Sequence, residues 1–420
     1  MSGGKTRDIN YTHQYIGQRF ERSLDFVPQY FHLYQARLSS LKHRAITASG
    51  EPGLNELTEL GAGQTGVVAG IIIRLHKQRS SIIQHYIAKV GDPEPLETKY
   101  YDSEDEVYLE DESGRIKLEG TEDLVTGSVV SVKGCLENSV LKVQTVFYPY
   151  IDTPMKIESQ GDEYIAFVSG LEVGTPNYDL MLLHLLAQFL QGNLGDQALE
   201  KARSIVRLVV LGDSLYRPDE ARQLDRKAVA DQQLGGLSDM GECLQYLDTF
   251  LAELAGSLPV DLIPGEADPT NASFPQQPIS PYLLPQASRY SALNSFPNPY
   301  ECTLDELRIL CTSGQNVKSL AQFSKDKSWT EHMEVQLKLR HLAPTAPDAL
   351  HCIPMKEDPF VLETLPHVYL CGCMPEYETK LTQEGVKLVS VPSFSKPPHK
   401  VVLLNRFTLE TETITFESFL

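Results

Sequence analysis

The stretch that decides the fold is Ile205–Leu211, which reads IVRLVVL and is followed at once by Gly212-Asp213-Ser214. A nearly continuous apolar run of this length, ended by a glycine, predicts a strand that is buried on both of its faces. The Gly-Asp-Ser turn stands at the end of this strand. It is the main candidate in the chain for catalytic or metal-binding chemistry.

Strands and helices alternate on both sides of this segment. Ile165–Val168 is expected to be a short buried strand, and Asp179–Leu190 a helix that is apolar nearly all round. Asp239 can cap a helix that carries a leucine-rich stripe from Met240 to Leu258. This alternation predicts a layered α/β domain over residues 156–420. The other strands expected in it are Val260–Ile263, Leu307–Leu310, His367–Cys371, Lys387–Val391, Val401–Leu404 and Thr413–Phe416.

The first part of the chain has a different pattern. Apolar residues at three- and four-residue spacing between Tyr30 and Leu41 predict an N-terminal helical segment, which we place in residues 1–45, with helix over 11–45. From residue 66 to 150 the period changes to two, and short strands separated by turns predict an OB-like β-barrel, assigned to residues 46–155. The strands expected there are Val67–Leu75, Glu106–Leu109, Arg115–Leu118, Leu124–Gly134 and Val140–Tyr148.

Composition excludes several classes of protein. The chain has 420 residues and a formal net charge of −19, whereas proteins that hold nucleic acid by themselves usually present a basic face. It contains no apolar run of about 18 residues and no apolar stretch near its start, so neither a membrane span nor a secretory signal is expected. The seven cysteines are then expected to be reduced thiols of a cytosolic or nuclear protein, without a zinc site at Cys371-Gly372-Cys373.

Two short motifs match catalytic signatures. The stretch from Gly61 to Gly66 fits the dinucleotide fingerprint G-x-G-x-x-G, but a β-rich run follows where a helix is required, so a flexible turn is expected. Gly212-Asp213-Ser214-Leu215 fits the GDSL block of serine hydrolases, with Ser214 as the nucleophile. Gly314–Asn316 would then form the oxyanion hole, with Asp348 and His351 as acid and base. This hydrolase is kept as an alternative, although in such enzymes the serine block stands near the start of the domain.

The same strand ends also fit a dinuclear metallophosphoesterase. In that class two divalent ions share a carboxylate and activate a water, and the ligands follow the strands as D-x-H, G-D-x-x-D, G-N-H-D/E and G-H-x-H. Asp213 and Asp268 remain here, but one bridging carboxylate cannot hold two metals, so the pattern predicts a phosphoesterase scaffold with its site emptied. An active metal-dependent phosphodiesterase or exonuclease that uses Asp213 is the second alternative. The positions of the missing ligands are held by Ser169, Leu171, Tyr216, Glu266, Ala267, Cys373 and Pro375.

Longer stretches are more specific than these tetrapeptides, and they run in order along nearly the whole chain. They are QYFHLYQARL (29–38), EDEVYLEDESGRIKLEG (104–120), LVTGSVVSVKG (124–134), PVDLIPGEADPTNASFPQQPISPYLLP (259–285), TSGQNV (312–317), RHLAPTAPD (340–348) and PHVYLCGCMPEY (366–377). On these stretches the sequence resembles the B-subunit family of replicative DNA polymerases, in its delta-type branch.

The resemblance implies an OB domain joined to a catalytically inactive phosphodiesterase-like domain. It implies a nuclear, non-catalytic scaffold subunit that bridges the cysteine-rich C-terminal domain of the catalytic subunit to an accessory third subunit in DNA replication and repair. No cofactor and no membrane partner follow from it, and DNA is met only through the complex. Related archaeal D-family subunits act as exonucleases and keep histidines where this chain has Ser169–Leu171, Ala267 and Cys373–Pro375.

Residues 269–300, the proline-rich segment, are the expected partner-binding surface. They hold one charged residue, Arg289, and seven prolines. Prolines lower the entropy cost of ordering a loop, and the cores of interfaces are poor in charge and rich in aromatics. The alternative is a long loop packed over the protein's own sheet. The candidate partner-binding residues are Phe274, Tyr282, Leu283, Leu284, Tyr290 and Phe296.

An acidic run lies beside the expected hairpin of the barrel, with seven acids between Asp102 and Glu112. An OB barrel that binds single strands needs a basic groove with stacking aromatics. The acids therefore predict a barrel that binds protein, while a solvated charged face is the alternative.

Overall fold

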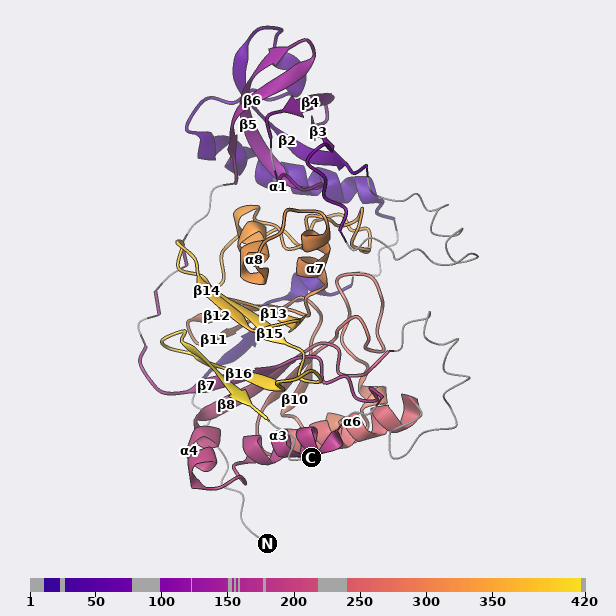
Figure 1. Ribbon diagram of the computed structural model, residues 1–420, viewed down its shortest axis with the longest axis vertical. Helices are drawn as coiled ribbons and strands as arrows, with labels where there is room; N and C mark the ends of the chain where they lie inside the picture. The colour runs from indigo at the N-terminus through magenta and orange to yellow at the C-terminus, as the bar shows by residue number, and fades with distance from the viewer. Residues whose placement is uncertain are drawn as a thin grey trace. The chain divides into compact units, whose positions relative to one another are not determined.

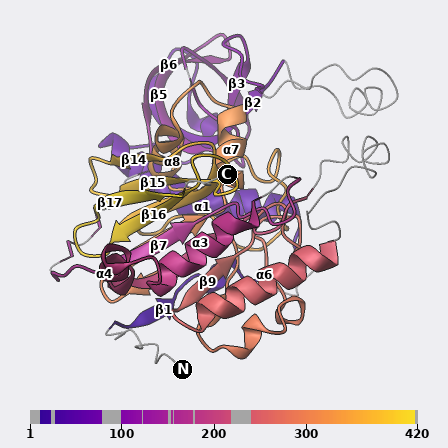
Figure 2. The same ribbon diagram turned by 60° about the horizontal axis from the view of Figure 1, so that its bottom comes forward.

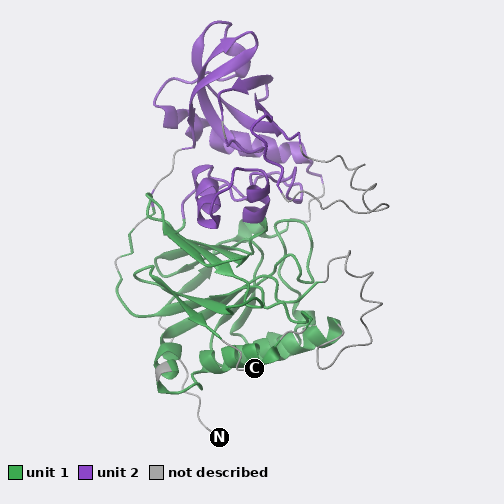
Figure 3. Cartoon of the chain, in the orientation of Figure 1, with its two compact units in different colours: residues 1–22, 154–315, 366–420 green, residues 23–153, 316–365 purple. Residues whose placement is uncertain are grey.

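The computed structural model describes residues 11–22, 27–77, 99–121, 123–149, 153–154, 156–157, 159–176, 179–217 and 240–416 (Figure 1). The chain divides into two compact units (Figure 3). Unit 1 comprises Met1–Arg22, Pro154–Gln315 and Pro366–Leu420, and unit 2 comprises Ser23–Thr153 and Asn316–Leu365. The division differs from the expected boundaries, because residues 316–365 belong to the unit of the barrel and not to that of the α/β layers.

Unit 1 is built on two sheets, each with six strands in the part of the chain that is described. The first has the order β10-β9-β8-β7-β16-β17, in which β7 to β10 are parallel to one another and β16 pairs antiparallel with both β7 and β17. Its strands are β7 (Tyr164–Val168), β8 (Ile205–Leu211), β9 (Val260–Ile263), β10 (Leu293–Ser295), β16 (Lys400–Asn405) and β17 (Thr411–Thr415).

The second sheet has the order β1-β11-β12-β13-β15-β14, with β12, β13 and β15 parallel. Apolar side chains from both sheets form one core between them, to which Phe167 and Val209 contribute from the first sheet and Leu370 and Val391 from the second. The strands of the second sheet are β1 (His13–Tyr15), β11 (Tyr300–Leu304), β12 (Leu307–Thr312), β13 (Val368–Met374), β14 (Glu378–Leu381) and β15 (Lys387–Pro392).

Helices cover the outer face of the first sheet. They are α3 (Leu180–Gln191), α4 (Asp196–Ser204) and α6 (Met240–Ala255), and α3 and α6 run side by side (Figure 2). The Asp179 side chain accepts a hydrogen bond from the Met181 N–H and so caps α3, which confirms the helix expected from the all-round apolar pattern. Asp239, the expected cap of α6, lies outside the described residues.

The start of the chain differs from the expected helix over residues 11–45. His13–Tyr15 forms strand β1, which pairs antiparallel with β11 so that His13 faces Leu304. The helix, α1 (Tyr30–Ser49), begins only at Tyr30 and ends at Gly50, whose φ of 68° is left-handed. Pairing with a distant strand and contacts of the Tyr15 ring with Phe296 and Tyr300 determine the structure here, against the local pattern.

Unit 2 contains a closed barrel of five strands in the order β2-β3-β4-β6-β5, which confirms the expected OB-like topology. The strands are β2 (Thr65–Leu75), β3 (Glu106–Glu110), β4 (Arg115–Glu119), β5 (Val129–Glu137) and β6 (Val140–Phe147). Helix α1 packs on β2 and β5, and the later part of the chain adds α7 (Gln315–Gln322) and α8 (Trp329–Lys338). The stretch from Gly61 to Gly66 is a turn that enters β2, so it is no dinucleotide site. None of the described helices has the length and hydropathy needed to cross a bilayer.

Candidate functional site

The ends of parallel strands from both sheets of unit 1 meet at one edge, which is where the sequence pattern placed the candidate ligands. The backbone links successive strand ends, because the Gly170 N–H donates to the Gly212 carbonyl and the Gly212 N–H donates to the Ile263 carbonyl, both at 2.9 Å. The approach is very close at two glycines. A Cβ on Gly265 would lie 2.2 Å from the Asp213 nitrogen, and one on Gly372 would lie 2.4 Å from the Leu211 oxygen.

Asp268 holds two turns of this edge together. One of its carboxylate oxygens accepts the Ser214 and Leu215 N–H groups at 2.9 and 3.1 Å, and the other accepts the Gly265 N–H at 2.8 Å. Burial, reinforced by the Asp213 carboxylate, raises the pKa of Asp268 to about 7, against the opposite effect of the three N–H donors. The Asp268 side chain therefore acts as a backbone cap between the turns that follow β8 and β9.

Asp213 has a similar but more exposed position. Its Oδ1 accepts the Ala267 N–H at 2.9 Å, and its backbone is left-handed with φ of 48°. A non-glycine residue in that conformation is uncommon, and Asp and Asn are among the residues that tolerate it best. The two carboxylates that the sequence singled out thus lie in adjoining turns, and both bind backbone N–H groups.

The positions of the other expected ligands are also engaged with the protein itself. The Ser169 hydroxyl accepts the Cys373 N–H at 2.9 Å and lies 3.0 Å from the Pro392 carbonyl, to which it donates. The Cys373 thiol lies 3.3 Å from the Leu211 carbonyl oxygen, and Ser169 and Cys373 are both buried. Within the described residues, no group of three or more His, Cys, Asp or Glu side chains is placed to hold a metal ion.

The residues of the alternative serine hydrolase are not brought together as a catalytic site. The Ser214 hydroxyl is buried and, among the described residues, has no hydrogen-bond partner. Asp348 and His351 belong to unit 2, whereas Ser214 belongs to unit 1. The Asn316 amide, expected in the oxyanion hole, donates to the Leu342 carbonyl at 2.9 Å. A serine nucleophile needs a base within hydrogen-bond reach, and none of the described residues supplies one to Ser214.

The proline-rich segment separates into a packed part and an exposed part. Phe274 and Leu284 are buried, Leu283 packs at the edge of the core under α3 and α6, and the Phe296 ring lies 4.6 Å from that of Tyr300. By contrast, Tyr282 is 92% exposed and Tyr290 44% exposed. The segment is tied to α6 by the Asp248 carboxylate, which accepts N–H groups of Gln286 and Ala287.

Two ion pairs within the hairpin lie on the outer face of β3 and β4 in the barrel. The Lys117 ammonium lies 2.6 Å from a Glu106 oxygen, and the Arg115 guanidinium donates to Glu110 at 2.6 Å. Two other members of the acidic run make structural contacts within unit 2. The buried Asp105 carboxylate pairs with Arg74 at 2.9 Å, and Asp111 accepts the Leu57 N–H at 3.1 Å.

A buried arginine is the residue of unit 2 that the sequence analysis missed. The Arg37 guanidinium is fully buried and lies 2.7 Å from Asp358, and it also donates to three carbonyls, those of Gly127, Pro344 and Ala346. The His341 imidazole lies 2.8 Å from the same Asp358 oxygen. The nearby His341 and Arg37 hold the pKa of Asp358 well below its usual range, although burial acts in the opposite direction. The two stretches QYFHLYQARL and RHLAPTAPD meet at this cluster, which is the signal that could have found it.

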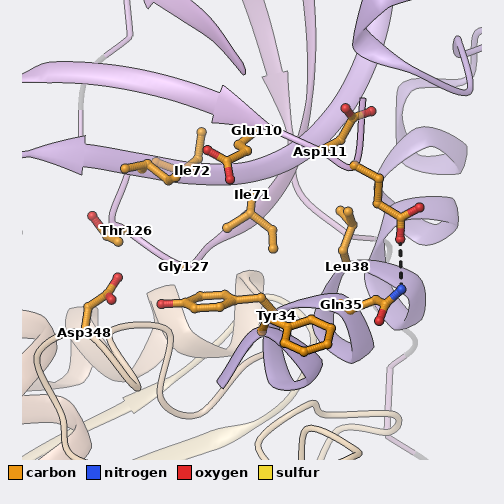
Figure 4. Close-up of a pocket in the computed structure, with 13 residues that line it drawn as sticks. Tyr34, Gln35, Leu38, Ile71, Ile72, Glu110, Asp111, Thr126, Gly127 and Asp348 are labelled. Carbon is orange, nitrogen blue, oxygen red and sulfur yellow. Dashed lines mark hydrogen bonds between the residues drawn. The ribbon is translucent and has the colours of Figure 1, made fainter. Parts of the chain in front are cut away.

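A groove lies between α1 and the barrel in unit 2, and we call it the α1 groove (Figure 4). Its volume is about 630 Å³. The lining residues are Phe31, Tyr34, Gln35, Leu38, Ile71, Ile72, Ile73, Glu110, Asp111, Glu112, Thr126, Gly127 and Asp348.

Comparisons with known proteins give the family. The chain matches the family model of the DNA polymerase delta subunit OB-fold domain at residues 29–146 and that of the DNA polymerase alpha/epsilon B-subunit at residues 165–379. A DNA polymerase delta small subunit from Oryza sativa subsp. japonica is 36% identical, with 93% of each chain covered. One from Arabidopsis thaliana is 33% identical, with 96% of this chain and 95% of that relative covered.

A solved structure of a dimetal phosphatase from Danio rerio aligns with 61% of this chain and 100% of its own, at 12% identity and a TM-score of 0.26, which is too low a likeness to bear on the fold. The two family models and the relatives agree along nearly the whole chain. The chain therefore belongs to the DNA polymerase alpha/epsilon B-subunit family and has DNA polymerase delta small subunits among its relatives.

Proposed function

We propose that this chain is a non-catalytic accessory subunit of a delta-type replicative DNA polymerase. In this proposal it is a nuclear scaffold that bridges the cysteine-rich C-terminal domain of the catalytic subunit to an accessory third subunit. The observation that carries the proposal is the arrangement at the strand-end edge of unit 1. There the Asp268 carboxylate accepts three backbone N–H bonds, and Ser169 occupies the end of β7 with hydrogen bonds to the backbone.

These contacts argue against an active metal-dependent phosphodiesterase. A two-metal site needs ligands on both ions and a carboxylate that bridges them. Asp268 uses both of its oxygens to hold turns, and at the end of β13 Cys373 stands in place of a histidine and donates its N–H to Ser169. The packing of Gly265 and Gly372 against neighbouring backbone leaves the edge closely filled at these two points. We infer that this edge now has a structural role.

Contact with DNA is assigned to the whole complex and not to the isolated subunit. The outer face of the β3–β4 hairpin pairs each of its two cations with a glutamate, and the chain as a whole carries a net charge of −19. Phosphate contacts dominate the affinity of such proteins for nucleic acid, and they require cations that are not already paired. The exposed Tyr282 and Tyr290 of the proline-rich segment remain candidate partner-binding residues.

The experiment that tests the proposal has two arms. Elemental analysis of the purified chain and turnover of a nitrophenyl phosphodiester in Mn²⁺ should show neither stoichiometric metal nor activity, and two bound metals with turnover would refute the scaffold. In the second arm, the Asp213→Ala subunit is assembled with its polymerase partners. DNA synthesis by this complex should equal that of the wild-type complex, because in this proposal the Asp213 carboxylate serves to accept the Ala267 N–H. A strong loss of activity in a folded complex would contradict the proposal and argue for a cryptic metal site.

A further inference from the structure

The apolar stripe of α1 continues beyond the core of unit 2. Phe31, Tyr34, Leu38 and Leu41 are spaced by three, four and three residues, so they share one face of the helix. Exposure changes steadily along this face. Leu41 is 0% and Leu38 6% exposed, whereas Phe31 is 57% exposed. Phe31 thus extends the apolar face of α1 from the core to the surface, where it lines the α1 groove.

The opposite wall of the α1 groove extends the apolar surface. It comes from β2, where Ile71 and the half-buried Ile73 line the groove, whereas Ile72 is 0% exposed and belongs to the core of the barrel. Figure 4 shows the Tyr34 ring lying across the groove with its hydroxyl directed toward Asp348. A volume of about 630 Å³ is within the range of sites that receive a few side chains. The wall at Gly127 is fixed, because its carbonyl accepts from the buried Arg37 at 3.0 Å.

The acidic residues that line the α1 groove, which we call its rim acids, determine which kind of partner the groove can bind. Four of the lining residues carry carboxylates, namely Glu110, Asp111, Glu112 and Asp348, and the lining contains no lysine, arginine or histidine. Cations outside the lining balance two of them, since Arg115 donates to Glu110 and Lys42 lies 3.3 Å from Asp111. Glu112 is exposed, and its carboxylate accepts from a neutral donor in the groove, the Gln35 amide, at 3.3 Å (Figure 4). A polyanion such as DNA is repelled by this rim, and a basic segment is attracted.

We propose that the α1 groove binds a segment of a partner subunit that presents one or two large apolar side chains flanked by lysine or arginine. The apolar side chains fill the space between Phe31, Tyr34 and the isoleucines of β2, and the cations pair with the rim acids. This inference rests on the proposed scaffold function, and it assigns to that function one of its binding surfaces and the chemistry of the partner.

The test measures binding of the full-length chain to the C-terminal domain of the catalytic subunit and, separately, to the accessory third subunit. Phe31→Ala removes the exposed apolar anchor, and Glu112→Lys reverses the rim charge. Matched controls are Met181→Ala on α3, whose side chain is also 57% exposed, and Glu119→Lys on β4, which is exposed and outside the groove. Far-UV circular dichroism and thermal melting of each variant verify that it folds.

Both groove variants should weaken binding to one and the same partner by about tenfold or more, as truncation of an interface anchor commonly does, while both controls stay within about twofold. Glu112→Lys should also flatten the dependence of that affinity on salt between about 50 and 200 mM. Unchanged affinity of folded groove variants for both partners would overturn the inference while leaving the scaffold function intact. If the wild-type chain binds neither partner, the proposed function itself fails, and the inference fails with it. Self-association of the wild-type chain in sedimentation experiments that Phe31→Ala abolishes would assign the groove to a second copy and so refute the partner proposed here.

Discussion

Replacing Arg37 by alanine should strongly destabilise unit 2. The guanidinium is 0% exposed, lies 2.7 Å from Asp358 and donates to three backbone carbonyls. Removing one member of a buried ion pair costs about 3–5 kcal/mol, because the other charge stays buried without compensation. Each carbonyl that loses its donor adds a penalty of roughly 1–3 kcal/mol where water cannot replace it. These losses overlap, so we expect the free energy of unfolding of unit 2 to fall by about 4 kcal/mol or more.

The chain offers a direct assay for this unit. Its single tryptophan, Trp329, lies in α8 of unit 2, so urea unfolding followed by tryptophan fluorescence reports on this unit. Arg44→Ala is the matched control, since Arg44 lies on the same helix, is only half-buried and donates a hydrogen bond to the Glu363 carbonyl. We expect this control to lose less than about 1 kcal/mol. The double variant Arg37→Ala, Asp358→Ala should lose less than the sum of the single variants, because no buried charge is left alone. A loss below about 1 kcal/mol for Arg37→Ala would refute the reasoning.

Three further outcomes are expected. The pKa of Asp268 is raised to about 7 in the folded chain, so the native state binds more protons than the unfolded state above about pH 4. The free energy of unfolding of the wild type should therefore fall between pH 4 and 7 relative to that of Asp268→Asn. Parallel curves of stability against pH for the two proteins would contradict this. The isolated chain should bind single-stranded DNA weakly in fluorescence anisotropy at about 150 mM salt, and a submicromolar dissociation constant would overturn the assignment of DNA contact to the complex. Leu284→Ala removes a buried side chain and should lower the free energy of unfolding by about 2–5 kcal/mol, as measured by thermal melts. Tyr282→Ala changes a side chain that is 92% exposed, so it should leave melting unchanged and weaken capture of a polymerase partner. Unchanged capture of both partners by Tyr282→Ala would remove Tyr282 from the candidate interface.

The local sequence pattern was sufficient to predict the elements that consist of continuous apolar residues. Strand β8 and helix α3 were predictable because a continuous run of apolar residues has to be buried. Strand β1 was not predictable, since His13–Tyr15 is three residues long and is extended only because β11 lies beside it. Asp105 is buried, unlike the exposed members of the acidic run, because it pairs with Arg74, which is 31 residues away in the sequence. This pairing likewise could not be read from the local pattern.

The candidate site was predictable in part for the same reason. Asp213 and Asp268 were found from their place after strands, and the structure brings their turns together. The use of Asp268 as a backbone cap could not be read from the sequence, because it depends on N–H groups of Ser214 and Leu215, more than fifty residues earlier. Tyr282 and Leu284 are two residues apart and both have large side chains, yet one is 92% and the other 1% exposed. Only the packing of the segment on its own unit separates them.

The discontinuity of unit 2 has a consequence for how the chain is made. Arg37 and Asp358 are 321 residues apart, so on a ribosome that adds about 5–20 residues per second the arginine is synthesised roughly 15–65 s before its carboxylate exists. During that time the nascent barrel holds an unpaired guanidinium at a position that becomes dry in the finished protein. Unit 2 can complete its folding only after most of unit 1 has been translated, because residues 154–315 of unit 1 intervene. A messenger truncated before the codon of Asp358 therefore encodes a barrel that lacks its buried counter-ion. Quality control that acts on newly made chains would then encounter unit 2 in an incompletely folded state.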